Sequence, residues 1–114
     1  MSGRRRAPRR GDVVWVSLVP EAGHEQRGRR PALVVSPATY NRKVGLALLC
    51  PITSRTKGYP FEVPLPDGAG VEGVVLSDQI KSLDWRARRA TFICRVPDPV
   101  VAETLGRLRT LLDA

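Results

Sequence analysis

Short segments rich in β-branched and aromatic residues constrain the fold of this chain more than any other feature of its sequence. Residues 12–18 read DVVWVSL, and further strand candidates cover residues 32–36, 45–51, 60–65, 73–76 and 91–96. Turn-forming sequences separate them, among them Ser36-Pro37, Lys57-Gly58, Pro66-Asp67-Gly68 and Asp98-Pro99. Glycine, proline and aspartate favour turns through positive φ, a preset φ and side-chain bonds to the local backbone, respectively. Short strands at nearly regular spacing predict a small antiparallel β-barrel.

The C-terminal segment follows a different pattern. Val101, Leu105, Leu108 and Leu112 recur at intervals of four, three and four residues, which places them on one face of a helix. Asp98 suits the N-cap, and Pro99 suits the first helical position because its φ is already helical. We expect the apolar stripe to pack on the barrel, since a small barrel needs a cover to complete its core. The predicted fold is mainly β with one C-terminal helix.

The length and the charge of the chain limit its organisation and its partners. A chain of 114 residues supports one hydrophobic core, so we expect a single domain. A total of 19 Lys and Arg against 11 Asp and Glu gives a net charge of +8, which favours a polyanionic partner. Five of the arginines lie within the first ten residues: Arg4, Arg5, Arg6, Arg9 and Arg10. We expect residues 1–10 to form a disordered basic arm, either a solvated tail or a phosphate contact, and residues 11–114 to form the folded domain.

Several common chemistries are excluded by the absence of their motifs. The sequence contains no GxxxxGK[ST], HExxH, CxxC or GxSxG motif, and it has one histidine. Cys50 and Cys94 lie in apolar strand-like segments and are expected to be buried free thiols. We therefore expect no metal site and no cofactor. No apolar segment approaches the roughly 20 residues of a membrane span, and the basic start is not followed by the apolar h-region of a signal peptide. We therefore expect no membrane partner and a cytoplasmic location.

Two polar groups lie where predicted strands meet loops. Residues 25–31 read EQRGRRP and lead directly into an apolar strand, and residues 51–54 read PITS and close another strand. Catalytic and binding residues are over-represented on loops that a rigid scaffold positions. These two junctions are where the sequence predicts a functional site.

Four ordered blocks of sequence carry a family resemblance. They are GDVVWV at residues 11–16, EQRGRRPALVVSP at 25–37, PITSRTKGYPFEV at 51–63 and SDQIKSLDWRAR at 77–88. In this order and spacing they resemble the MazF/PemK/Kid family of toxins. The resemblance extends over residues 11–112, which is far more specific than a single short motif.

The resemblance implies a fold, a reaction and a set of partners. The implied fold is the small antiparallel SH3-like β-barrel of the CcdB/PemK type. The implied protein is a homodimer, inhibited by a cognate MazE-like antitoxin, and it contacts operator DNA through the antitoxin complex. The implied reaction is sequence-specific, metal-independent cleavage of single-stranded RNA, giving a 2′,3′-cyclic phosphate and a 5′-hydroxyl and thereby inhibiting translation.

Three residues match the family's catalytic positions. Arg30 matches the arginine of the G-x-R-P block, Thr53 the first hydroxyl residue after the strand-ending proline, and Glu25 the acid five residues before that arginine. The RNA supplies its own 2′-hydroxyl nucleophile, so the enzyme needs only to remove a proton and stabilise charge on the phosphate. We expect Glu25 to act as the base, Arg30 to bind the phosphate oxygens, and Thr53 to donate a hydrogen bond to them. The structural alternatives are an exposed Glu25–Arg30 ion pair and a Thr53 side chain that forms an ST-turn.

Further residues are assigned less specific roles. The candidates for substrate binding are Arg29, Ser54, Lys57, Gln79 and Arg86, although basic residues on a solvated face are the commoner case. We expect Trp15 to lie in the core and leave Trp85 open between the core and base stacking. His24 is a candidate acid for the leaving 5′-oxygen that the family pattern does not require.

Two other functions compete with the nuclease. One is a CcdB-like poison of DNA gyrase without enzymatic activity, and the other is a passive nucleic-acid-binding barrel. A binding-only barrel needs neither a base nor a phosphate clamp, so the retained set Glu25, Arg30 and Thr53 favours the nuclease. The RNA sequence that is cut and the identity of the antitoxin are not encoded in spacing alone.

Overall fold

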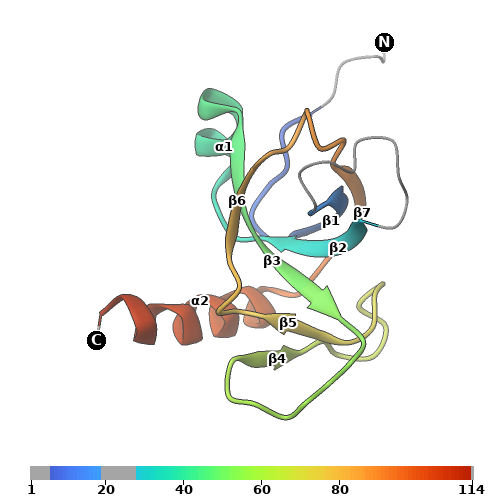
Figure 1. The fold of residues 1–114 in the computed structure, drawn as a ribbon, viewed down its shortest axis with the longest axis vertical. Helices are drawn as coiled ribbons and strands as arrows, with labels where there is room; N and C mark the ends of the chain where they lie inside the picture. The colour runs from blue at the N-terminus through green and yellow to red at the C-terminus, as the bar shows by residue number, and fades with distance from the viewer. Residues whose placement is uncertain (1–5, 19–27, 114) are drawn as a thin grey trace.

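The computed structural model describes residues 6–18 and 28–113. The strands form one curled antiparallel layer, and the C-terminal helix lies against one side of it (Figure 1). The elements follow in the order β1 (Asp12–Ser17), β2 (Arg29–Val34), α1 (Ala38–Val44), β3 (Leu46–Thr53), β4 (Glu62–Pro64), β5 (Val74–Leu76), β6 (Lys81–Asp84), β7 (Thr91–Arg95) and α2 (Asp98–Leu112).

The sheet is organised around β3. Its strands follow the order β4-β5-β3-β2-β1-β7, all pairs are antiparallel, and β6 pairs with the first half of β3. Among the described residues the path stays open between β4 and β7. The prediction of a mainly antiparallel β fold with a C-terminal helix is confirmed, as one curled, barrel-like sheet.

Six of the strands correspond to the predicted segments, and two elements were missed. β6 has the sequence KSLD, in which Leu83 alone is buried, so no apolar alternation marks it. α1 is a short helix of seven residues, and it ends at Gly45, whose φ of 83° belongs to the left-handed region. The sequence predicts a strand that starts at Gly45, whereas this residue is the C-cap that lets the chain turn into β3.

The two faces of the sheet bury separate clusters of side chains. One cluster contains Val13, Leu33 and Cys50 together with Val100 and Val101, so α2 covers this face as predicted. The helix begins at Asp98 and not after it: Pro97 is the N-cap and no side chain caps the helix, so the predicted role of Asp98 was wrong. Leu112, at the end of the predicted stripe, is 71% exposed because the helix extends past the sheet.

The other cluster contains Trp85, and the two tryptophans differ in their burial. Trp85 is 1% exposed within it, and its Nε1 donates a 2.9 Å hydrogen bond to the backbone oxygen of Asn41. Trp15 is 37% exposed, so the prediction that it lies in the core was wrong. Val13 and Trp15 share one face of β1, but only Val13 belongs to the cluster that α2 covers.

The two cysteines are free thiols, but their environments differ. Cys50 is buried, and burial, assisted by the charge of Asp78, raises the pKa of its thiol to about 12. Cys94 is only partly buried, which corrects the expectation for that residue. A thiol with so high a pKa as Cys50 is not a nucleophile at neutral pH.

The described part of the N-terminal arm, residues 6–10, differs from the expectation of a disordered tail. The backbone oxygen of Pro8 accepts a 2.9 Å hydrogen bond from Nδ2 of the buried Asn41. The Nε of Arg10 donates to the backbone oxygen of Val35 at 2.7 Å. Ala7 packs against the cluster that contains Trp85. Residues 1–5 lie outside the described part of the chain.

Within residues 6–18 and 28–113, neither helix has the length and apolar character needed to cross a membrane.

Candidate active site

Arg30 and Thr53 are brought together by the pairing of β2 with β3. Ala32 pairs with Pro51 in the antiparallel register. Extending that register by two residues sets Arg30 opposite Thr53, with both side chains on the same face of the sheet. The two sequence blocks that carry these residues therefore meet at one end of the strand pair.

An open pocket of about 500 Å³ lies at this junction. Its lining residues are Arg30, Pro31, Ile52, Thr53, Ser54, Arg55 and Glu72. Arg30 is exposed, and its Nη1 donates a long, 3.4 Å hydrogen bond to the backbone oxygen of Arg29. A guanidinium has five N–H donors, so most of those of Arg30 remain available to a ligand in the pocket.

Thr53 forms the ST-turn that was the structural alternative to a catalytic role. Its Oγ1 accepts a 3.1 Å hydrogen bond from the backbone N–H of Arg55. A hydroxyl can accept and donate at once, so this turn fixes the position of Oγ1 and leaves its proton free. The turn and the catalytic role are therefore compatible in this geometry.

Gly73 holds the chain close to Thr53. Thr53 pairs with Val74 at the start of β5, and the preceding Gly73 has a φ of 120°. A Cβ at this position would lie 2.2 Å from the backbone oxygen of Thr53. Only glycine lets the two backbones approach so closely. This role was not identified in the sequence, because it depends on pairing between β3 and β5.

Arg55 and Glu72 are further pocket residues that were not predicted from the sequence. Arg55 follows Thr53 by two residues in the same block, a signal that could have identified it. Glu72 reaches the pocket through the loop before β5. No spacing rule joins it to Arg30, because only the sheet order brings β5 next to β3.

The proposed base and acid lie outside the described residues. Glu25 and His24 fall in residues 19–27. Of the predicted catalytic set Glu25, Arg30 and Thr53, the structure therefore describes Arg30 and Thr53 alone. The two described residues that flank this segment are joined by a 3.0 Å hydrogen bond from the backbone N–H of Leu18 to the oxygen of Gly28.

The predicted substrate-binding residues are dispersed. Ser54 lines the pocket with Arg30 and Thr53. The guanidinium of Arg29 instead donates to the backbone oxygens of Trp15 and Arg89, both at 3.1 Å. A third bond, at 3.4 Å, reaches the oxygen of Arg88, so Arg29 ties the end of β1 to the turn before β7.

The remaining three candidates do not line the pocket. The guanidinium carbon of Arg86 lies 4.7 Å from the ring centre of Trp85. Gln79 is exposed in the turn before β6. The backbone N–H of Lys57 donates to the carboxylate of Glu62, and the Lys57 side chain is exposed. In the part of the chain that the structure describes, no three His, Cys, Asp or Glu side chains gather in a way that could hold a metal ion.

Solved structures define the class of protein to which this fold and pocket belong. MazF from Deinococcus radiodurans superimposes with a TM-score of 0.87 at 55% sequence identity, covering 96% of this chain and 100% of that one. The MazE–MazF complex of the same organism contains a chain that matches with a TM-score of 0.84 at 51% identity, covering 95% of this chain and 97% of that one. The class is that of small, mainly β toxins.

Sequence comparison identifies the family. The endoribonuclease toxin MazF of Escherichia coli K12 is 53% identical over 87 residues, which are 76% of this chain and 78% of that protein. The endoribonuclease PemK of Escherichia coli is 44% identical over 110 residues, 90% of this chain and 80% of that protein. The profile of PemK-like, MazF-like toxins of type II toxin-antitoxin systems matches residues 9–112. The chain belongs to this family.

Proposed function

We propose that this protein is the endoribonuclease toxin of a type II toxin-antitoxin pair and that it cuts single-stranded RNA, mRNA above all, at a specific sequence. Family membership and relatives named as endoribonucleases support the activity. The observation that carries the proposal is the pocket that Arg30 and Thr53 line together at the end of the paired strands β2 and β3. Such a pocket presents a fixed cation and a hydroxyl donor, the groups that a phosphodiester requires.

The reaction uses the 2′-hydroxyl of the RNA as its nucleophile. Glu25 removes the 2′-proton, the 2′-oxygen forms a bond to phosphorus, and the bond from phosphorus to the 5′-oxygen breaks. The leaving 5′-oxygen takes up a proton from water or His24. The products are a 2′,3′-cyclic phosphate and a 5′-hydroxyl.

Arg30 and Thr53 stabilise the charge that develops on the phosphate. The planar guanidinium of Arg30 can donate two parallel hydrogen bonds to the non-bridging oxygens. The Oγ1 proton of Thr53 donates to the same group, while the Arg55 N–H keeps the hydroxyl in place. Ser54 and Arg55 extend the donor-rich edge of the pocket toward neighbouring phosphates. None of these steps requires a metal ion or cofactor.

The partners are also part of the proposal. We propose a MazE-like antitoxin as the inhibitor, supported by the matching complex from Deinococcus radiodurans, and a homodimer as the active form. A cytoplasmic location and contact with operator DNA through the antitoxin complex remain predictions. An electrophoretic shift of promoter DNA by the toxin–antitoxin complex, compared with toxin alone, tests the last of these.

The function is tested by incubating the purified protein in EDTA with a long end-labelled RNA and with its all-deoxy counterpart. We expect discrete cuts in the RNA alone, with fragments that end in a cyclic phosphate, and loss of cutting in Arg30→Ala. Arg42→Ala is the matched control, because Arg42 is an exposed arginine on α1 outside the pocket. Intact RNA with a folded protein would reject the nuclease and favour a gyrase-binding or passively binding barrel.

A further inference from the structure

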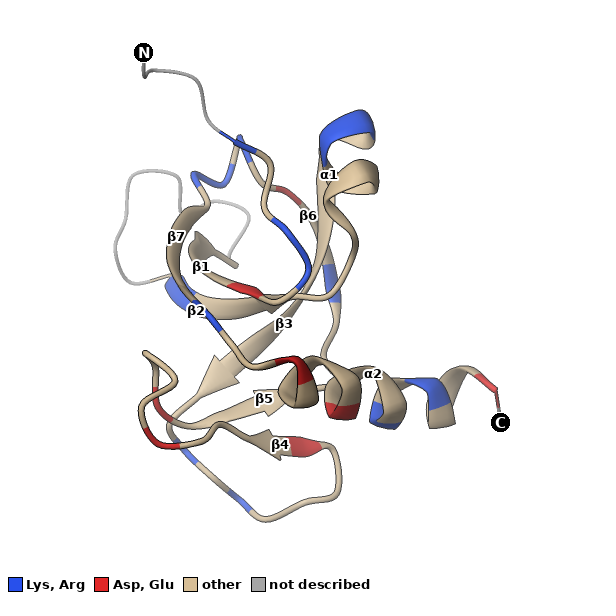
Figure 2. Cartoon of the chain, turned by 180° about the vertical axis from the view of Figure 1, so that it is seen from behind, with Lys and Arg blue, Asp and Glu red and all other residues tan. Residues whose placement is uncertain are grey.

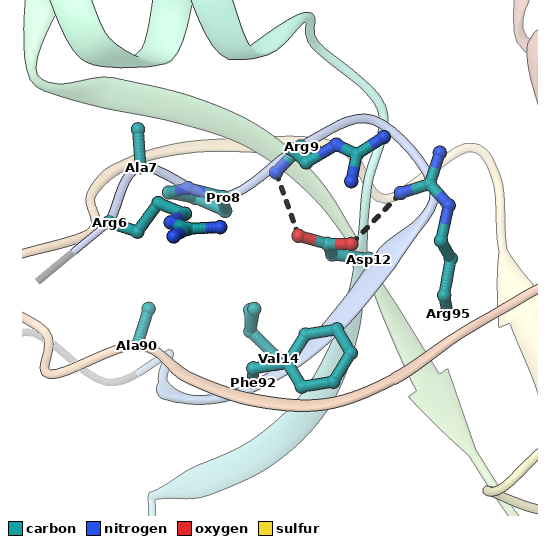
Figure 3. Close-up of a pocket in the computed structure, with 9 residues that line it drawn as sticks. All are labelled: Arg6, Ala7, Pro8, Arg9, Asp12, Val14, Ala90, Phe92 and Arg95. Carbon is teal, nitrogen blue, oxygen red and sulfur yellow. Dashed lines mark hydrogen bonds and ion pairs between the residues drawn. The ribbon is translucent and has the colours of Figure 1, made fainter.

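A second pocket lies between the N-terminal arm and β7. It has a volume of about 320 Å³, within the range of roughly 300–1,000 Å³ of small-ligand sites. Its lining residues are Arg6, Ala7, Pro8, Arg9, Asp12, Val14, Ala90, Phe92 and Arg95. Figure 3 shows the arm residues on one side and Ala90, Val14 and Phe92 on the other, while Asp12 and Arg95 close one end. Residues 6–8 precede the segment that the family profile matches.

The arm is fixed in the position that forms this pocket. Pro8 is buried and is bonded through its oxygen to Asn41. The backbone N–H of Arg9 donates a 2.8 Å hydrogen bond to the carboxylate of Asp12, and Arg10 is bonded to the backbone of Val35. These anchors lie within four residues of Arg6. The backbone positions that carry Arg6 and Arg9 are therefore preorganised, which reduces the entropy lost when a ligand binds.

The pocket carries a net positive charge. Arg6, Arg9 and Arg95 contribute three cations, and Asp12 contributes one anion. The Asp12 carboxylate is directed at Arg95, with its Oδ1 3.0 Å from Nη1, and its side chain is only 10% exposed. Within residues 6–18 and 28–113, no acidic side chain is paired with Arg6 or Arg9. Basic residues of the arm gather near β7 and α1 in Figure 2.

An exposed aromatic ring lies beside these cations. Phe92 is 61% exposed, although a phenyl ring gains by burial, and it lines the pocket beside Val14, across from Ala7 and Pro8. Cationic side chains beside an accessible ring are the combination that binds single-stranded nucleic acid, with phosphates on the cations and a base stacked on the ring.

The strand register relates this pocket to the active site. Phe92 pairs with Val14, and Val14 pairs with Ala32, two residues from Arg30 on β2. Cross-strand partners and residues two apart point to the same face of a sheet. The strand of Phe92 is thus two strands, or about 10 Å, from the strand of Arg30, with an offset of about 7 Å along it. A few nucleotides of an RNA strand can span this separation.

We propose that the pocket between the arm and β7 is a subsite for one nucleotide of the RNA substrate outside the cleaved bond. Arg6 and Arg9 bind its phosphate, Arg95 is held by Asp12 at the edge of the pocket, and the base stacks on Phe92. This inference rests on the proposed function, since it assigns part of the binding path of the same substrate. The subsite adds affinity without reading sequence, because every base has a π-face.

The test measures binding separately from cleavage. A randomised 20-nucleotide 2′-O-methyl RNA cannot be cut because its 2′-oxygen is methylated, and fluorescence anisotropy gives its Kd over a range of salt concentrations. We expect Arg6→Ala/Arg9→Ala to raise Kd about tenfold and to reduce the salt slope by about 0.7, the contribution of one single-strand phosphate. Phe92→Ala raises Kd at least about fivefold with no change in slope, and Phe92→Tyr restores it. The matched control Arg42→Ala/Lys43→Ala removes two exposed cations from α1 and leaves Kd within about twofold.

The outcomes separate this inference from the proposed function. Wild-type cleavage of natural RNA, together with unchanged Kd in both pocket variants, overturns the subsite and leaves the nuclease intact. A change in oligomeric state of Phe92→Ala in size-exclusion chromatography also overturns it, because the ring would then serve an interface. If both pocket variants lose affinity for an acidic 20-residue peptide while their RNA affinity is unchanged, the pocket is assigned to a protein partner instead. A raised Kd for RNA in both folded variants, with the control unaffected, supports the subsite.

Discussion

Replacing Gly73 by alanine tests how the fold positions Thr53. The added Cβ would lie 2.2 Å from the backbone oxygen of Thr53, 2.8 Å from its carbonyl carbon and 3.1 Å from the Cα of Ser54. Relieving these contacts requires a backbone shift of about 1 Å, since such atoms are ordinarily separated by about 3.5 Å. The shift falls on the end of β3, where Thr53 enters the pocket.

The expected cost has two components. A side chain at a φ of 120° costs about 1–3 kcal/mol, and the forced shift of packed backbone costs about another 1–3 kcal/mol. The sum of about 2–6 kcal/mol is a large share of the 5–15 kcal/mol of a typical domain, so Gly73→Ala is expected to fold with a lowered Tm. A displacement of about 1 Å at Thr53 is expected to reduce kcat about 100-fold.

Gly68→Ala separates the two components. Gly68 has a φ of 81°, but no atom lies within 4 Å of a Cβ built there, so this variant carries backbone strain without a collision. Urea unfolding followed by circular dichroism gives the two stabilities, and RNA cleavage at a temperature where both variants are folded gives the two rates. If Gly73→Ala matched Gly68→Ala in stability and cut RNA at the wild-type rate, the positioning argument would be refuted.

Three further predictions concern single side chains. Thr53→Val removes the hydroxyl and is expected to slow single-turnover RNA cleavage by about 10²–10³-fold, whereas Thr53→Ser retains most of the rate. If Thr53→Val cut RNA as fast as Thr53→Ser, Thr53 would have no role in the mechanism. Arg29→Ala breaks three bonds to backbone oxygens and is expected to lower the free energy of unfolding by about 1–3 kcal/mol, measured in urea; a weaker RNA affinity at unchanged stability would restore its predicted role in binding. Burial raises the pKa of Cys50 from 9.0 to about 12. Between these pH values the folded state retains a proton that the unfolded state loses. The contribution of the Cys50 thiol to the free energy of unfolding is therefore fully present below pH 9 and falls by up to about 1.4 kcal/mol per pH unit between pH 9 and 12. Urea titrations should show a steeper loss for the wild type than for Cys50→Ala, and parallel curves would contradict this assignment.

Local pattern was sufficient for most of the strands and for the C-terminal helix. In β1, apolar β-branched residues, and in β3, an apolar run bounded by turn formers, specify a strand whatever lies beside it. β6 could not be found in this way, because its polar residues form a strand only through pairing with β3. The helix α1 was also missed, since its seven residues lie too close to a strand-like segment to show a helical period.

The residues of the candidate site also divide into those that local sequence identified and those that only the fold brings to the pocket. Arg30 and Thr53 were identified by residue type within ordered blocks, and the register of β2 against β3 brings them together. Glu72 and Gly73 lie in the loop before β5, later in the chain, so no local signal connects them to the pocket. Arg29 was assigned to substrate from its charge, yet its guanidinium is bound to backbone oxygens.

The sequence by itself determined the class of fold, the family and three members of the pocket, Arg30, Thr53 and Ser54, because these depend on local periodicity and on residue types in order. Only the tertiary structure decided that Trp85 and not Trp15 is buried, that residues 7–10 pack against the sheet, and that β5 completes the pocket. The physical reason is that burial and hydrogen bonding depend on what covers each face of the sheet. That cover comes from elements distant in sequence, here α2, the turn before β7 and the arm.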